Sequence, residues 1–265
     1  MSWLNRVGWA PGWIVVLGFG LVSCAPLRPA GPVLHQTSTL TALLDGGYDA
    51  ATTCGELRRQ GNFGIGTFDH LDGEMILLDG VIYQARADGV VTRAPDSLGV
   101  PFAAVTRFVS SASRNLDPAS DLESLKHQLD AMRPGGNLFL AFRIDGTFDR
   151  VKYRSVPAQT KPYPKLTDVA AKQPVFERQA IRGTLLGFWC PEYAKALNLP
   201  GYHLHFISED RKSAGHLLDC ALRQGQASIE EIPELHLRLP QTSEFQALSL
   251  SGDATRAMKA AESGK

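Results

Sequence analysis

Residues 201–216 read GYHLHFISEDRKSAGH, and they place three of the chain's seven histidines within fourteen residues. Side chains at positions i and i+2 of a β-strand point to the same face, so a strand here presents His203 and His205 together. The polar stretch 208–215 ends in glycine and is typical of a hairpin turn. The segment therefore predicts a β-hairpin that brings His216 back beside the pair.

This hairpin places three imidazoles near one point. Three neutral nitrogen ligands on two adjacent strands form an open tetrahedral site for zinc or a similar divalent ion, with room for water or substrate. We therefore predict a metal site made by His203, His205 and His216. The alternative is that each histidine is satisfied separately by backbone or solvent. We keep that interpretation for the other four histidines, which are His35, His70, His127 and His236.

A second interpretation of the hairpin includes Glu209, which follows His205 by four residues. His203-x-His205-x3-Glu209 matches the first metal motif of the cupin barrels. Cupins take their remaining histidine from a separate, later motif, whereas here it follows eleven residues after His205. A cupin-like oxygenase with a redox metal is therefore an alternative, and Glu209 is read more simply as a solvated turn carboxylate.

Outward from the hairpin, strands and tight turns dominate the chain. Segments 75–85 (MILLDGVIYQA) and 138–153 (LFLAFRIDGTFDRVKY) each contain an Asp-Gly pair between two strand-like runs. Asp-Gly tolerates the positive φ of a type I′ turn, so both segments predict β-hairpins. Further strands are expected around 183–189 and 234–239. Strands with few helices indicate an α+β fold, a mixed α/β architecture of two sheet-based halves with mixed β-sheets.

One helix is well marked, and a short one is expected after Pro191. Ser120 can cap the first helix, whose apolar residues share one face, and the Pro-Gly-Gly at 134–136 ends it. A faint internal repeat relates 64–77 to 181–205. It suggests the hypothesis of a duplicated fold, in which Glu74 takes the place of the histidine strand.

Composition divides the chain into five segments. Residues 1–23 read as a signal peptide, and 24–35 as a disordered tether because closely spaced prolines deny regular hydrogen bonding. Residues 156–174 contain four prolines and are expected to form a linker. The linker separates an N-terminal sheet domain, 36–155, from a C-terminal metal-binding sheet domain, 175–265.

The first residues contain an export signal. Arg6 precedes an apolar run, 13–22, that is too short to span a membrane. The run ends in Leu21-Val-Ser-Cys24, the pattern after which bacterial lipoprotein precursors are cut and lipidated. We therefore expect an exported protein on the periplasmic face, an outer-membrane lipoprotein anchored through Cys24. The alternative is an ordinary signal and a secreted protein.

Charge and cysteine content limit the function classes. Lys+Arg and Asp+Glu are equal at 27 each, and no basic run interleaves with aromatics, which excludes a nucleic-acid-binding surface. A small-molecule partner is expected. The remaining cysteines, Cys54, Cys190 and Cys220, are odd in number, which excludes a full disulfide framework and favours small buried hydrophobes.

Three separated motifs together resemble the bacterial α-acetolactate decarboxylase family. They are the histidine segment, GTFDHLDGEM at 66–75 and VKYRSVPAQTKPYP at 151–164. The resemblance extends from about residue 36 to the C-terminus. It implies a two-domain α/β fold of mixed sheets, commonly a homodimer. It also implies a zinc enzyme that converts acetolactate to acetoin and carbon dioxide, in the butanediol branch of pyruvate metabolism.

The resemblance also implies roles for individual residues. From the residues alone, Glu74 reads as a turn carboxylate and Arg154 as part of a solvated basic strand edge with Lys152. The family's site falls on these positions: zinc ligands on His203, His205 and His216, carboxylates on Glu74 and Glu262, an arginine on Arg154 and a threonine on Thr67.

The chain departs from the family at two places. Lys161 stands where arginine is usual, and the lipobox ending at Cys24 is unusual, so the compartment does not follow from the resemblance. A second function class shares the lipobox and the histidines. It is a non-catalytic periplasmic metal-binding lipoprotein, which needs neither Arg154 nor the two glutamates.

Overall fold

The structure is a computed structural model that describes residues 31–250 and Ala257. The signal peptide predicted at 1–23, Cys24 and Glu262 lie outside the described residues. Within the described part, no helix has the length and apolar character needed to cross a membrane.

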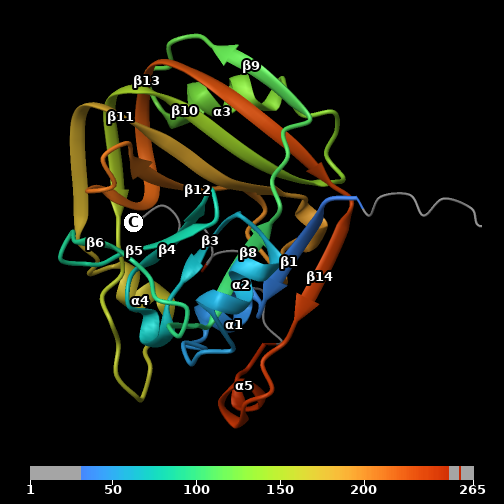
Figure 1. The fold of residues 1–265 in the computed structure, drawn as a ribbon. Coiled ribbons are helices and arrows are strands. Elements are labelled where there is room, and N and C mark those ends of the chain that lie inside the picture. Colours follow the sequence, from blue (N-terminus) through green and yellow to red (C-terminus); the bar gives the residue numbers. More distant parts are fainter. Residues whose placement is uncertain (1–30, 251–256, 258–265) are drawn as a thin grey trace, which may run out of the picture. The chain divides into compact units, whose positions relative to one another are not determined.

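Among the described residues, seven strands form a mixed sheet (Figure 1). In spatial order they are β14 (Glu234–Arg238), β1 (Val33–Thr37), β8 (Phe102–Thr106), β3 (Phe63–Thr67), β4 (Glu74–Leu78), β5 (Val81–Ala85) and β6 (Val91–Arg93). β1 and β14 run parallel, and the other neighbours are antiparallel. The predicted β4–β5 hairpin is confirmed. Its turn residues, Asp79 and Gly80, have φ of 51° and 80°, as a type I′ turn requires.

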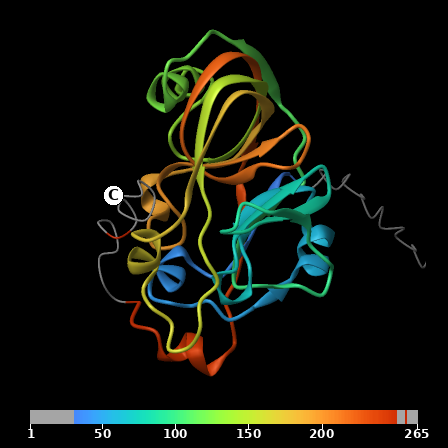
Figure 2. The same ribbon diagram turned by 90° about the vertical axis from the view of Figure 1, so that its left-hand side faces the viewer.

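Five further strands of the described chain form a second sheet. They are β10 (Phe139–Arg154), β11 (Val175–Cys190), β12 (Gly201–Ser208), β13 (Ala214–Ile232) and β9 (Ala112–Leu116). β10 pairs with both β11 and β13, and β12 pairs with β11 and β13, so these four strands close into a ring. Figure 2 shows the long strands curling round to do so. The predicted fold class, mixed sheets with few helices, is confirmed.

The hairpin predicted at Asp145-Gly146 is wrong, because β10 runs through it without a turn. Gly146 lies between Gly183 of β11 and Gly225 of β13. A Cβ at Gly146 would lie 2.7 Å from the carbonyl oxygen of Gln224, closer than side chains tolerate. Gly146 lets three strands approach one another, whereas the glycine of Asp79-Gly80 forms a turn.

The two sheets alternate along the chain. β1 begins at Val33, three residues before the expected start of ordered structure, and places His35 opposite His236 of β14. β9 and β10 belong to the second sheet although they precede residues 156–174, and β14 returns to the first sheet. The proline-rich segment is therefore not the boundary between the sheets. Pairing with the distant strand β1 assigns β14 to the first sheet. No local sequence pattern indicates this pairing.

The predicted helix is confirmed as α3 (Leu122–Asp130), with Asp121 as its N-cap in place of Ser120. The Asp121 side chain accepts from the Ser124 N–H and the Ser124 side chain from the Asp121 N–H, a capping box. A short 3-10 helix, η2 (Glu192–Ala194), follows Pro191 as expected. The remaining short elements are α1 (Leu40–Leu44), β2 (Thr52–Thr53), α2 (Cys54–Gln60), η1 (Asp69–Leu71), β7 (Gly99–Val100), α4 (Leu166–Ala170) and α5 (Ser243–Ala247).

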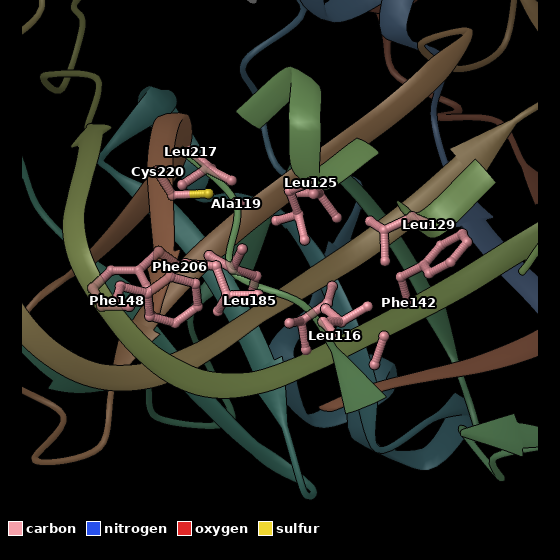
Figure 3. Packing of buried hydrophobic residues seen from close by; sticks show 14 of the residues in the cluster. Leu116, Ala119, Leu125, Leu129, Phe142, Phe148, Leu185, Phe206, Leu217 and Cys220 are labelled. Atoms are coloured by element: carbon pink, nitrogen blue, oxygen red, sulfur yellow. The ribbon is translucent and has the colours of Figure 1, made fainter. Parts of the chain in front are cut away.

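Apolar clusters hold the sheets in place. In Figure 3, Leu125 and Leu129 of α3 pack over Phe142, Leu185 and other side chains of the second sheet. Another cluster joins side chains of both sheets, including Ile65, Ile76, Ala141, Leu186 and Phe188. The two sheets therefore pack against each other. Within the described residues the three cysteines, Cys54, Cys190 and Cys220, are buried and form no disulfide, as expected.

Candidate metal centre and active site

The β12–β13 hairpin brings the three predicted histidines together. His205 lies directly opposite His216 in the strand register, and His203 is two residues before His205 on the same face. All three side chains are buried, and their candidate ligand nitrogens lie within 4.8 Å of one another. The ring centroids are 5.0–5.4 Å apart. The geometry suits three imidazoles around one ion.

His205 has the orientation and charge state of a metal ligand. Its Nδ1 lies 3.0 Å from the carbonyl oxygen of Met75 on β4, which can only accept, so Nδ1 carries the proton. Its buried Nε2 has no hydrogen-bond partner among the described residues. Burial, and then the nearby His203 and His216, hold the pKa of His205 well below its usual value. A neutral ring with Nε2 available, oriented through Nδ1 by a backbone carbonyl, is the usual arrangement of a metal-binding histidine.

Two glycines allow the histidine strands to lie this close to their neighbours. A Cβ at Gly187 of β11 would lie 2.0 Å from the carbonyl oxygen of His203. A Cβ at Gly215, just before His216, would lie 2.2 Å from the carbonyl oxygen of Arg154. Any larger residue at either position would force the backbones apart and displace a histidine.

Glu74 and Thr67 come from the first sheet, where they face each other across the β3–β4 pair. Glu74 is buried, and its Oε2 lies 3.7 Å from Nε2 of His205. Thr67 is also buried, and its hydroxyl donates to the carbonyl oxygen of Gly73 at 2.7 Å, which closes the loop before Glu74. Within this loop, His70 and Leu71 both have positive φ, of 59° and 60°. Such strained backbone is concentrated at functional sites in proteins.

Arg154 is the last residue of β10 and lies opposite His216 in the register. It is only 4% exposed, whereas Lys152 on the same strand is exposed. Its Nη1 donates to Oε1 of Gln173. Burial excludes the solvated-edge interpretation for Arg154, since a cation is removed from water only at a substantial free-energy cost.

These residues meet at one cavity of about 40 Å³ at the junction of the sheets, where β4 contacts β12 and β13 (Figure 1). The first sheet supplies Thr67 and Glu74, and the second supplies Arg154 and the histidines. The rest of the wall is largely apolar and consists of Leu40, Leu43, Gly66, Leu71, Phe102, Val156 and Leu166. The cavity thus combines a cation, a carboxylate and three imidazoles with an apolar wall.

The sequence model of the alpha-acetolactate decarboxylase family matches residues 34–252. The chain belongs to this family. The alpha-acetolactate decarboxylase of Methanosarcina mazei is 44% identical over 216 residues, which cover 82% of this chain and 75% of that protein. The protein of the same name from Bacillus subtilis is 41% identical over 212 residues, covering 80% and 83%. The crystal structure of alpha-acetolactate decarboxylase from Bacillus subtilis strain 168 superposes with a TM-score of 0.85 at 38% identity, covering 88% of this chain and 100% of that one.

Of the residues that the family resemblance singled out, all but Glu262 lie at this cavity. Glu262 lies outside the described residues, but Ala257, five positions earlier, packs against an apolar cluster that includes Leu40 and Leu43 of the cavity wall. Glu209 is exposed in the β12–β13 turn, 3.5 Å from Arg182, as the solvated-turn interpretation predicted.

Lys161, the position of the family departure, pairs with Asp49 at 2.8 Å and is not part of the cavity wall. Sequence reasoning missed other residues around the site. Gln173 and the apolar wall had no motif or spacing that could have revealed them. Only the fold identifies them: Gln173 accepts a hydrogen bond from Arg154, and the apolar residues line the cavity with the histidines.

Proposed function

We propose that this chain is a zinc-dependent acetolactate decarboxylase, which releases carbon dioxide from 2-acetolactate and forms acetoin. The observation that supports this best is the cavity in which three buried histidines lie together with Glu74 and Arg154. Membership of the alpha-acetolactate decarboxylase family, and the names of its relatives, support the choice of substrate.

The chemistry of acetolactate explains why such a cavity suits it. The substrate is a β-keto acid with a tertiary hydroxyl, so loss of carbon dioxide leaves an electron pair that must move toward the ketone oxygen. Zinc held by His203, His205 and His216 would supply a Lewis acid that polarises the hydroxyl and ketone oxygens. The buried Nε2 of His205 and its fixed tautomer fit this role.

Arg154 binds and orients the substrate carboxylate. A guanidinium offers paired N–H donors that match a carboxylate and keeps its charge at any working pH. Because Arg154 is buried, its attraction for the carboxylate is screened less than it would be at the surface. Among the described residues its buried Nε has no hydrogen-bond partner, which leaves a donor for the substrate.

Glu74 and Glu262 handle protons in this proposal. Glu74 stands beside His205, where its carboxyl group can accept the hydroxyl proton and return a proton to carbon on one face, which yields a chiral product. The hydroxyl of Thr67 steadies the loop before Glu74. Glu262 is proposed as the second carboxylate, and the packed position of Ala257 supports this.

The apolar wall would contact the two methyl groups of acetolactate. Leu40, Phe102 and Val156 are buried apolar residues that line the cavity. A dry wall also strengthens the electrostatic interactions of Arg154 and Glu74 with the substrate.

The test is an acetoin assay on purified mature protein with racemic acetolactate, with and without a chelator, together with elemental analysis. Replacing His205 with Ala is expected to abolish both zinc retention and acetoin formation, whereas His236→Ala, an exposed histidine on β14, should change neither. A metal-free His205→Ala protein with full activity would refute the proposal. Zinc-loaded wild type that forms no acetoin would favour the non-catalytic lipoprotein, and iron in place of zinc would favour the cupin-like oxygenase.

Export, lipidation at Cys24 and the homodimer stay predictions. Mass spectrometry of the mature N-terminus tests the first two, because a cut before a diacylated Cys24 and a cut at an ordinary signal site give different masses. Sedimentation analysis tests the third.

A further inference from the structure

The guanidinium of Arg154 is only partly satisfied by the protein. It carries five N–H donors in a rigid fork. Nη1 donates to Oε1 of Gln173, while the buried Nε has no hydrogen-bond partner among the described residues. Buried donors in proteins are nearly always paired, so an unpaired Nε in the wall of a cavity indicates a ligand that accepts there.

Gln173 is held against Arg154 by the backbone on both sides of it. It lies between α4 and β11, and its N–H donates to the carbonyl oxygen of Ala170 at 3.4 Å. The next residue, Pro174, accepts from the Ser155 N–H, and Val175 is the register partner of Arg154. The chain around Gln173 therefore runs antiparallel to the chain around Arg154, and the two side chains are kept in contact.

The side chain of Gln173 is poorly suited to simple packing. Its Nε2 is buried and has no hydrogen-bond partner in the part of the chain that the structure describes. An amide that enters a buried site and makes a single hydrogen bond is disfavoured relative to an apolar side chain of the same size. Among the described residues, the only hydrogen bond made by this side chain is the one with Arg154, and this bond is therefore the interaction that accounts for an amide here.

The neutrality of Gln173 matters as much as its hydrogen bond. A carboxylate at this position would hold Arg154 more tightly, but it would cancel the positive charge that attracts an anionic substrate. An amide oxygen orients the guanidinium and leaves its net charge unchanged. The combination is what a site needs when its arginine must recognise a carboxylate.

We infer that Gln173 is a positioning residue that fixes the guanidinium of Arg154 so that its remaining donors receive the substrate carboxylate. This inference rests on the proposed function, because acetolactate supplies that carboxylate. Gln173 acts through Arg154 and has no part in the proton transfers.

The test compares three variants of the full chain in steady-state assays with acetolactate. Gln173→Leu keeps the size and removes the hydrogen bond, Gln173→Glu keeps an acceptor and adds a negative charge, and Gln179→Leu is the control. Gln179 is an exposed glutamine on β11. We expect KM to rise about 10- to 100-fold in Gln173→Leu, the range for a hydrogen bond to a charged group. Gln173→Glu should raise KM at least as much. In both Gln173 variants the fold-decrease in kcat should be smaller than the fold-increase in KM. The control Gln179→Leu should match wild type.

Product inhibition separates positioning from a general structural defect. Acetoin lacks the carboxylate, so its inhibition constant should stay within about twofold of wild type in Gln173→Leu, although KM for acetolactate rises. Equal weakening of acetoin and acetolactate, or an unchanged KM in both Gln173 variants, would overturn the inference. If Gln173→Leu does not fold, Gln173→Glu supports the same comparison. Wild-type protein that forms no acetoin would contradict the proposed function. This outcome is different from those that contradict the role of Gln173.

Discussion

Replacing Gly187 with Ala adds one methyl group at the point where β11 packs against the backbone of His203. The new Cβ would lie 2.0 Å from the His203 carbonyl oxygen and 3.0 Å from the Cα of Leu204. An ordinary contact is at least 3.4 Å, so β12 must move away by about 1.4 Å. The nearest atoms are backbone atoms of His203 and Leu204, which cannot relieve the clash by changing rotamer.

A shift of that size is large on the scale of a metal site. Ligand distances in such sites vary by about 0.2 Å, and a misplacement of about 1 Å at a reacting centre can reduce the rate about 100-fold. We therefore expect Gly187→Ala to lose most of its zinc and to lower kcat/KM at least about 100-fold. Overpacking should also cost about 1–3 kcal/mol of stability.

Zinc content, acetoin formation and urea denaturation measure these effects, and two further glycines provide controls. Gly136→Ala lies in open space and should be neutral. Gly146→Ala overpacks β13 away from the histidines, with a Cβ 2.7 Å from the carbonyl oxygen of Gln224, and should lower stability while the folded protein keeps its zinc. If Gly187→Ala retained wild-type zinc and activity, or if Gly146→Ala lost zinc equally, the argument from local displacement would be wrong.

Two other predictions concern stability. Leu125→Ala removes a fully buried side chain of α3 and should lower the free energy of unfolding by about 2–5 kcal/mol in urea denaturation; a loss below about 1 kcal/mol would mean that the helix is not held by this core. Glu230 is buried on β13, and burial raises its pKa although it accepts the Val109 N–H. The pKa of Glu230 is therefore higher in the folded than in the unfolded state. Its contribution to the free energy of unfolding is fully present below the unfolded-state pKa and is lost as the pH rises through the folded-state pKa. Glu230→Gln cannot ionise, so its stability relative to wild type should increase as the pH rises above the ordinary pKa of a glutamate, and a difference that does not change with pH would contradict the assignment.

The local parts of the fold and site were predictable from the sequence. Strand alternation placed His203 and His205 on one face, and the polar turn returned His216, because both depend on neighbours within a few residues. Asp79-Gly80 predicted its hairpin for the same reason.

The non-local parts were not predictable. Asp145-Gly146 is the same dipeptide in a continuous strand, because Gly183 and Gly225 on other strands set its role. Gln173 becomes recognisable only when the pairing of distant segments places it against Arg154. The family resemblance supplied Glu74 and Arg154, which local pattern had assigned to a turn and a strand edge.

The hydrogen bond from His205 to the Met75 carbonyl oxygen crosses from one sheet to the other. The orientation of this candidate metal ligand and the docking of the two sheets are thus parts of one equilibrium. By thermodynamic reciprocity, an ion that favours the ordered ring of His205 also favours the docked sheets, and a mutation that loosens the junction weakens the hold on the ion by the same factor. Zinc would therefore act as a structural ligand of the whole junction, and substitutions far from the histidines, such as those in the shared apolar cluster, would appear first as lower metal affinity.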